Sequence, residues 1–250
     1  MPRLEFVEVT PNVLCVRRPW YLSNSYIVHD DAGVTLVDAG MEADGADMIA
    51  GLAHLGRRVD EVKWILLTHW HNDHSSGAEA IRELSGARVV YHAKEESHFS
   101  RTAVGGARQR IANALPEHGP AAALKALVGQ SPPRAVAAYE HAAHEAIIDS
   151  RFRVIETPGH TSGHVSYVYL PGRVLFTGDA LALCRGRLWF MSRFLTEDRE
   201  RARESMLECA RTEADAICPG HRGPLNAGVR EHQQMLRAYL EAGRPWPLLS

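Results

Sequence analysis

Four of the seven residues from position 68 to 74 carry side chains that bind metal ions, and their spacing suits two ions. His69 and His71 are two residues apart, so in extended backbone their imidazoles leave the chain on the same side. Asp73 and His74 are adjacent, which suits a turn that aims both side chains at a second, neighbouring position. This segment predicts chemistry in which bound cations activate a water molecule.

Three further metal-binding side chains each follow a glycine at the end of a short apolar run. They are His160, Asp179 and His221, and the runs are 152–156, 173–176 and 216–218. A catalytic zinc keeps one position open for water, so two zinc ions need about six or seven protein donors, one of which can bridge. Together with the first segment, these residues supply a complete set of donors.

Strands and loops must position these donors, because metal and catalytic residues favour loops at the ends of strands. The apolar segment 64–67 predicts a buried strand, and residues 78–84 predict a helix. Further strands are expected at 13–16, 26–28, 34–37 and 88–91, and further helices at 42–55, 197–212 and 229–242. The sequence is therefore typical of a strand-rich α/β fold.

Residues 94–150 differ from the rest of the chain. They are rich in alanine and histidine and are interrupted by prolines at positions 116, 120, 132 and 133. This composition predicts a helical insertion at about 94–150, with two or three helices. The insertion is placed to cover the metal-binding segments as a lid, and extra helical packing on the sheets is the alternative.

Composition places the chain among ordinary globular proteins. It has 250 residues, 45% hydrophobic and 23% charged, with a net charge of −2 and no linker-like segment, so a single domain over 1–250 is expected. The charge predicts no nucleic-acid partner, and no apolar run is long enough for a membrane span. Four scattered cysteines and a start without signal-peptide character favour a cytoplasmic protein with reduced thiols. A small-molecule substrate is expected, and a homo-oligomer is left open.

The motifs HxHxDH, PGHTxGH, TGD and PGH occur in that order, after the segment Leu-Val-Asp-Ala-Gly at 36–40. In this the chain resembles the metallo-β-lactamase fold superfamily. The resemblance implies a four-layer αββα sandwich of the metallo-β-lactamase type, here with a helical insertion and with the metals at one edge of the sheets. It covers residues 36–221, most of the chain.

The resemblance also implies roles for individual residues. His69, His71 and His160 would hold a first metal; Asp73, His74 and His221 would hold a second; and Asp179 would bridge them. Asp38 would orient a ligand imidazole by a hydrogen bond. Two Zn²⁺ ions are the expected cofactors, because sites rich in histidine with a few carboxylates suit zinc, while iron and manganese remain alternatives.

Two zinc ions can share a hydroxide, because they lower the pKa of the bound water to about 7. Asp73 and Asp179 can accept a proton while they ligate, which gives them a catalytic role. Hydrolysis of a small ester, thioester or lactone is the expected reaction. Trp70, Trp189 and Phe190 would line an apolar substrate pocket, with ordinary core burial as the equal alternative.

Several relatives of this fold are alternatives. True metallo-β-lactamases usually lack the bridging aspartate, so Asp179 makes the chain look nearer to glyoxalase II and the lactonases. About 29 residues follow His221, whereas glyoxalase II carries a helical C-terminal domain, and the helper tyrosine of acyl-homoserine lactonases is replaced by Ala182. A phosphodiesterase or β-lactam hydrolase of the same fold is a further alternative.

Two alternatives come from other classes of protein. Persulfide dioxygenases share the same motifs but bind a single iron with two histidines and one aspartate, which correspond here to His69, His160 and Asp179. A non-catalytic metal-binding scaffold is the other alternative. Metal content and activity on a panel of substrates would separate them.

Overall fold

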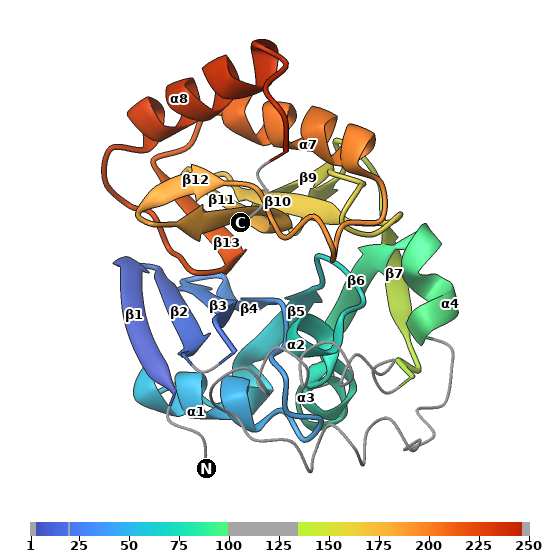
Figure 1. Ribbon diagram of the computed structural model, residues 1–250. Helices are drawn as coiled ribbons and strands as arrows, with labels where there is room; N and C mark the ends of the chain where they lie inside the picture. Colours follow the sequence, from blue (N-terminus) through green and yellow to red (C-terminus); the bar gives the residue numbers. More distant parts are fainter. Residues whose placement is uncertain (1–3, 20, 100–134, 247–250) are drawn as a thin grey trace.

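The computed structural model describes residues 4–19, 21–99 and 135–246 (Figure 1). The strands are β1 (Glu5–Thr10), β2 (Val13–Arg18), β3 (Ser23–Asp30), β4 (Gly33–Val37), β5 (Val62–Leu66), β6 (Arg88–His92), β7 (Tyr139–Ala142), β8 (Ile147–Ile148), β9 (Phe152–Glu156), β10 (Val165–Tyr169), β11 (Val174–Cys184), β12 (Arg187–Trp189) and β13 (Ala216–His221). The α-helices are α1 (Ala46–His54), α2 (Asn72–Ser75), α3 (Ala78–Ser85), α4 (Glu96–Phe99), α7 (Arg199–Arg211) and α8 (Val229–Glu241), with 3₁₀ turns η1 (Val59–Glu61) and η2 (Ala93–Glu95).

The strands form two halves of a continuous, curled sheet. The order along the sheet is β7-β6-β5-β4-β3-β13-β11-β10-β9-β8, with β1 and β2 continuing beside β3 and β12 beside β11. The residue pair of His221 opposite Ser23 joins the halves where β13 meets β3. The neighbours β4 to β7 are parallel, so their carboxyl ends lie along the same edge.

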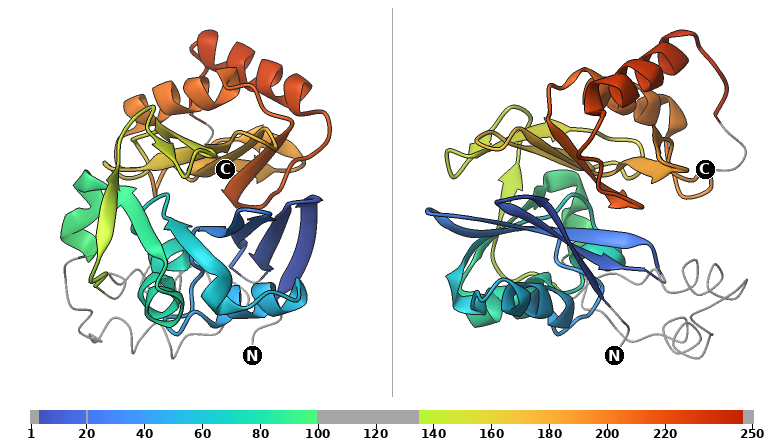
Figure 2. Two further views of the ribbon diagram at one scale, coloured as in Figure 1. Left: turned by 180° about the vertical axis from the view of Figure 1, so that it is seen from behind. Right: turned by 90° about the vertical axis from the view of Figure 1, so that its left-hand side faces the viewer.

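The layers follow the expected αββα order. Helices α1 and α3 cover the outer face of the first half, and α7 and α8 cover the outer face of the second (Figures 1 and 2). Three apolar clusters fill the spaces between the four layers, one between the two halves and one under each helical layer. The predicted four-layer sandwich is therefore confirmed.

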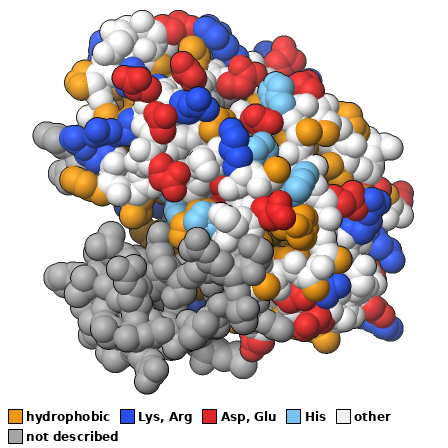
Figure 3. All heavy atoms as spheres, turned by 90° about the vertical axis from the view of Figure 1, so that its right-hand side faces the viewer, with side chains coloured by type: hydrophobic (Ala, Val, Ile, Leu, Met, Phe, Trp, Pro, Cys, Tyr) orange, Lys and Arg blue, Asp and Glu red, His pale blue; other side chains and the backbone are white. Residues whose placement is uncertain are grey.

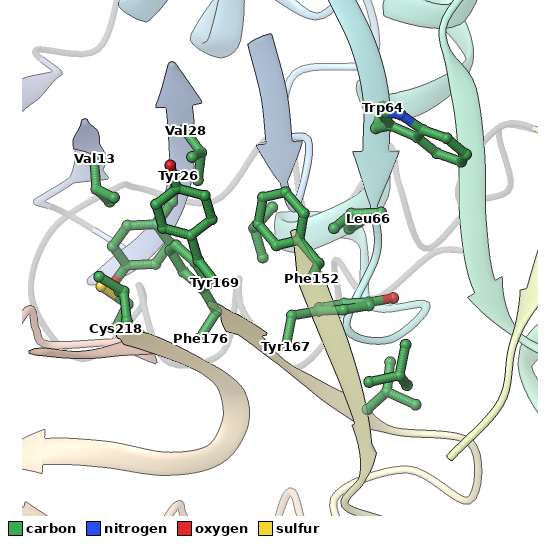
Figure 4. Packing of buried hydrophobic residues seen from close by; sticks show 14 of the residues in the cluster. Val13, Tyr26, Val28, Trp64, Leu66, Phe152, Tyr167, Tyr169, Phe176 and Cys218 are labelled. Carbon is green, nitrogen blue, oxygen red and sulfur yellow. The ribbon is translucent and has the colours of Figure 1, made fainter. Parts of the chain in front are cut away.

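The alternation of apolar side chains along each strand explains why both faces of the sheet are covered. In β2, Val13 and Cys15 enter the central cluster, whereas Leu14 and Val16 enter the cluster under α1. This period of two is the one that a pleated strand imposes. In the centre, the rings of Tyr26 and Phe176 meet at 5.3 Å between centroids (Figure 4).

The predicted helical insertion at 94–150 is wrong over its last part. Residues 139–142 form β7, which extends the first half beside β6, and residues 147–148 form β8 beside β9. In the described part of the segment, helical turns occupy only residues 94–99, while 100–134 lie outside the described residues. High alanine content misled the prediction, because pairing with an open sheet edge overrides a weak local propensity.

Surface charge is mixed on the face that Figure 3 shows, where basic and acidic side chains are interspersed. Within the described ranges, no helix is both long enough and apolar enough to cross a bilayer.

A buried arginine ties the two halves together at the end opposite the β13–β3 junction. Arg151, which is 7% exposed, donates to Asp30 at 2.5 Å and to Thr35 at 3.2 Å, and it also pairs with Asp149. Tyr169 donates to the other oxygen of Asp30 at 2.7 Å. Asp30 and Thr35 belong to the first half and Tyr169 to the second, so this network fixes their spacing.

Replacing Arg151 with methionine is expected to lower the free energy of unfolding by roughly 2–3 kcal/mol, because it leaves Asp30 partly buried without its cation. Urea unfolding at pH 7 measures the change. The matched control is Arg173→Met, which removes an exposed arginine that pairs with Glu213 and Asp215, and it is expected to cost less than about 1 kcal/mol. Equal losses in the two variants would contradict the role of Arg151.

The same network makes the stability of the fold depend on pH in the acid range. Burial alone would raise the pKa of Asp30, but hydrogen bonds from Tyr169 and Arg151 hold it below its ordinary value. A depressed carboxyl pKa stabilises the fold above about pH 4, and this stabilisation is lost as the pH falls through the folded-state pKa. The difference in unfolding free energy between wild type and Arg151→Met should therefore shrink below about pH 4.

Candidate metal centre

The first half of the sheet positions one side of the site at the carboxyl ends of β4 and β5. β5 ends at Leu66, and the chain then passes through His69 and His71 into α2, whose single turn carries Asp73 and His74. β4 ends at Val37, so Asp38 lies beside the start of that loop. The Asp38 carboxylate accepts a hydrogen bond from the backbone N–H of Thr68 at 2.8 Å.

The second half of the sheet supplies the other side of the site. His160 lies in the turn between β9 and β10, as expected. Asp179 and His221 are not in loops after their strands, which corrects the prediction: Asp179 lies within β11, and His221 is the last residue of β13. The pairing of β11 with β13 shifts register on both sides of Gly178, and this irregularity aims Asp179 at the site.

A glycine at position 220 is required by this close approach. A Cβ atom at Gly220 would lie 2.2 Å from Oδ1 of Asp179 and 2.7 Å from Cε1 of His74. No side chain fits in that space, so the glycine before His221 allows β13 to pass directly behind the acidic residue.

The structure brings all seven predicted donors together in two adjoining groups. In each group, the candidate ligand atoms lie within 4.8 Å of one another. In the first, Nδ1 of His71 lies 3.0 Å from Nε2 of His69 and 3.0 Å from Nε2 of His160. The groups are His69, His71, His160 and Asp179, and Asp73, His74 and His221.

Asp179 lies between the two groups. One of its oxygens is 3.2 Å from Nε2 of His160 in the first group and 3.4 Å from Nε2 of His221 in the second. The other oxygen is 3.5 Å from Nε2 of His74. A carboxylate in this position can serve both groups.

Two buried residues hold the donors in orientation. Asp38, which is 2% exposed, lies 2.8 Å from Nδ1 of His74 and so leaves Nε2 of that ring facing the site. His164 accepts a hydrogen bond from the backbone N–H of Asp179 at 3.0 Å, while its other ring nitrogen lies 2.9 Å from the hydroxyl of Thr157. The sequence places His164 within the histidine-rich motif, but only the fold reveals its contact with Asp179.

The two groups differ in their affinity for protons. Burial lowers the pKa of His71 to about 4 and those of His69 and His160 well below their ordinary range, so these imidazoles are neutral. Burial opposes charge on His221 as well, but Asp179 and Asp73 outweigh it and raise its pKa to about 9. The pKa of His74 is likewise raised by the surrounding carboxylates. Cation binding at the second group must therefore release protons.

The donor set fits a pair of divalent metal ions. Nε2 of His74 and Oδ1 of Asp179 are both buried and face each other at 3.5 Å, but neither atom forms a hydrogen bond. Buried polar atoms without partners are costly, and a metal ion would satisfy both. The imidazoles of the two groups, together with the carboxylates of Asp73 and Asp179, are the kind of mixed nitrogen and oxygen donors that zinc prefers.

The three aromatic residues of the predicted pocket lie in different places. Trp70, between His69 and His71, is half-buried at the site. Phe190 is fully buried under α8, 5.6 Å from the ring of Tyr239, and Trp189 stacks edge-on against the same ring at 4.9 Å. The expectation that Phe190 lines the pocket is wrong, because this residue is buried in the apolar cluster under α7 and α8. Trp189 is partly buried against the same cluster, and its place in the pocket stays a prediction.

The αββα fold and the histidine-rich site at the junction of its halves define a class of metal-dependent hydrolases. Residues 18–221 match the family model described as the metallo-beta-lactamase superfamily, and the chain belongs to that superfamily.

Similar curated proteins carry hydrolase names. A hydroxyacylglutathione hydrolase from Chelativorans sp. (strain BNC1) is 28% identical over 72% of this chain and 61% of its own length. Another from Cereibacter sphaeroides (strain ATCC 17025 / ATH 2.4.3) is 32% identical over 67% of this chain but 52% of its own length. The match thus spans little more than half of these relatives. The probable metallo-hydrolase YflN of Bacillus subtilis (strain 168) is 27% identical over 82% of both chains.

Solved structures share the architecture. A metallo-beta-lactamase family protein from Thermus thermophilus is 26% identical, with a TM-score of 0.63 over 94% of this chain and 81% of its own. The metallo-beta-lactamase SMB-1 superposes with a TM-score of 0.67 over 96% of each chain at 20% identity, which is a likeness of fold.

Proposed function

We propose that this metal-dependent hydrolase binds two zinc ions and cleaves a small carboxylic thioester, ester or lactone, with thioesters as the preferred class. The position of Asp179 between the two groups of donors carries the proposal, because it provides a shared ligand for two ions. The names of the hydroxyacylglutathione hydrolases from two organisms support the thioester class.

When bound, two zinc ions supply a water of lowered pKa and polarise the substrate carbonyl. The protein's own residues prepare this chemistry. His69, His71 and His160 are neutral and need no deprotonation to act as donors. Burial would raise the pKa of both carboxyl groups, but their histidine neighbours lower it and keep Asp73 and Asp179 ionised, which is the form in which a carboxylate binds a metal ion. We propose that one of these two carboxylates would also accept the proton of the attacking water once the ions have neutralised the surrounding charge.

Asp38 contributes orientation rather than proton transfer. Its hydrogen bond fixes the ring of His74 with Nε2 toward the site, and its second oxygen is occupied by the backbone of Thr68. Of the aromatic residues expected to line the pocket, Trp70 lies directly beside the site, because its ring meets that of His71 edge-on at 4.5 Å. We propose that it contacts the acyl group of the substrate. We propose a small-molecule substrate, with no nucleic-acid or membrane partner.

The proposal is tested by metal analysis together with a substrate panel. We expect two zinc ions per chain and a kcat/KM for acyl thioesters or aryl esters that exceeds those for a phosphodiester and a chromogenic cephalosporin by roughly 100-fold, since the first of these reacts at phosphorus and the second is a bulky bicyclic amide. The thioester arm should include glutathione and a second, smaller thiol. A preference for the phosphodiester or the cephalosporin would contradict the substrate class, and metal-free protein of full activity would contradict the mechanism.

A further inference from the structure

Glu95 is a buried acidic residue that lies next to the first group of donors without belonging to it. It is the last residue of η2, directly after β6, and only 1% of it is exposed. Burial raises the pKa of its carboxyl to about 7, although hydrogen bonds from Gly163 and Trp70 counteract this. A carboxylate is seldom buried unless its oxygens are hydrogen-bonded, so its partners indicate what it does.

The two oxygens of Glu95 accept hydrogen bonds from two different loops. Oε2 accepts from the backbone N–H of Trp70 at 3.0 Å, and Oε1 accepts from the backbone N–H of Gly163 at 2.7 Å. Trp70 lies between His69 and His71, and Gly163 lies three residues after His160. The single carboxylate therefore joins the two loops that carry the three imidazoles of the first group.

The opposite loop is shaped to receive this carboxylate. A Cβ atom at Gly163 would lie 2.6 Å from Oε1 of Glu95 and 2.8 Å from its Cγ. Any other residue at this position would push Glu95 away from the loop of His160. The glycine within the PGHTSGH segment thus serves the contact with Glu95.

A second contact comes from the same short segment. The ring of His98, in α4, stacks on the indole of Trp70 at 4.2 Å between centroids, with the planes 6° apart. Glu95 thus holds the backbone of Trp70 while His98 covers its side chain. Both contacts act on the residue that separates two of the candidate ligands.

We propose that Glu95 is a positioning residue that clamps the His69–His71 loop to the His160 loop and so sets the zinc affinity of the first group. This inference rests on the proposed metal binding but not on the identity of the substrate. Partners that orient metal ligands without touching the ion typically change metal affinity by roughly 10- to 100-fold. The effect of losing Glu95 should fall on one of the two zinc ions.

The experiment titrates metal-free protein with Zn²⁺ against a chromophoric chelator at pH 8, where Glu95 is ionised. Glu95→Gln keeps the shape of the side chain but turns one accepting oxygen into an amide donor. We expect it to weaken one of the two zinc-binding constants roughly 10- to 100-fold and to leave the other within about threefold. His160→Ala identifies the affected step, because it should abolish the same one.

Two further variants complete the design. Gly163→Ala disturbs the contact with Glu95 from the opposite loop, and it should weaken the same zinc-binding constant. Glu96→Gln is the matched control, since Glu96 is the exposed neighbour whose carboxylate accepts from the hydroxyl of Tyr139, and it should leave both constants unchanged. Thermal unfolding of the metal-free proteins establishes that each variant is folded.

The possible results separate the clamp from the proposed function. The clamp would be overturned if both zinc-binding constants were unchanged in Glu95→Gln, or if both weakened equally together with a lower unfolding temperature. In either case, two zinc ions bound to the wild type would still support the proposed function. Wild-type protein that binds no zinc would overturn both.

Discussion

Replacing Asp179 with asparagine is expected to reduce kcat for the best thioester or ester by roughly 10³-fold, which corresponds to about 4 kcal/mol of transition-state stabilisation. The amide keeps the size of the side chain but removes the charge that faces both groups of donors. Asp179 lies 3.2 Å from His160 and 3.4 Å from His221, so its loss affects both. Steady-state kinetics and metal content, measured on the same preparation, check this result.

The matched control is Asp215→Asn, which makes the same chemical change at an exposed residue that pairs with Arg173. It should retain full activity and two zinc ions. The metal content of Asp179→Asn is expected to fall below two per chain, because a neutral amide is a weaker ligand than a carboxylate. Near-normal activity in Asp179→Asn would be incompatible with a bridging role for this residue.

The donor residues could be predicted from the sequence because metal chemistry restricts both residue type and local geometry. His160 and His221 follow glycines for a physical reason that the structure makes plain at Gly220, where no Cβ atom fits beside Asp179. The apolar run before each donor predicted a strand, and a strand is found there in each case. Residue types and spacing therefore carry enough information for the donors, whereas the order of the four layers came from the resemblance to the superfamily.

Residues that act through tertiary contacts could not be predicted in this way. Glu95 is 25 residues from Trp70 and 68 from Gly163 in sequence, and no local pattern links them. The sequence predicts a structural role for His164 and not metal binding, but it does not reveal the partner, which the fold shows to be the backbone N–H of Asp179. Phe190 could not be assigned either, because whether an aromatic residue lines a pocket or a core depends on which helix packs over it.

Asp179 was predicted to lie in a loop, but the structure places it within a strand. Hydrogen bonding between β11 and β13 continues past the acidic residue, with the register shifts around Gly178 absorbing the change in direction. A glycine and a polar residue after an apolar run usually indicate the end of a strand. Here they mark an irregularity inside one, which holds the donor on a more rigid element than a loop.

Replacing His221 with alanine is expected to separate the hydrolase from the persulfide dioxygenase alternative. The hydrolase needs Asp73, His74 and His221 for its second ion, so the variant should hold about one zinc ion and lose roughly 10²- to 10³-fold in kcat/KM for the preferred ester or thioester. The dioxygenase alternative uses His69, His160 and Asp179, and it predicts unchanged iron content and unchanged oxygen uptake on a persulfide.

The geometry favours the first outcome. Nε2 of His221 lies 3.3 Å from Asp73 and 3.4 Å from Asp179, and these carboxylates raise the pKa of its imidazole to about 9 against the effect of burial. A histidine held this firmly between two carboxylates is part of the same charged cluster as the proposed bridge. His144→Ala serves as the control, because it removes an exposed histidine that belongs to neither group of donors, and it should change neither metal content nor rate. Full hydrolytic activity in His221→Ala would refute the dinuclear mechanism, whereas loss of the second zinc together with the rate would show that both groups of donors work as one site.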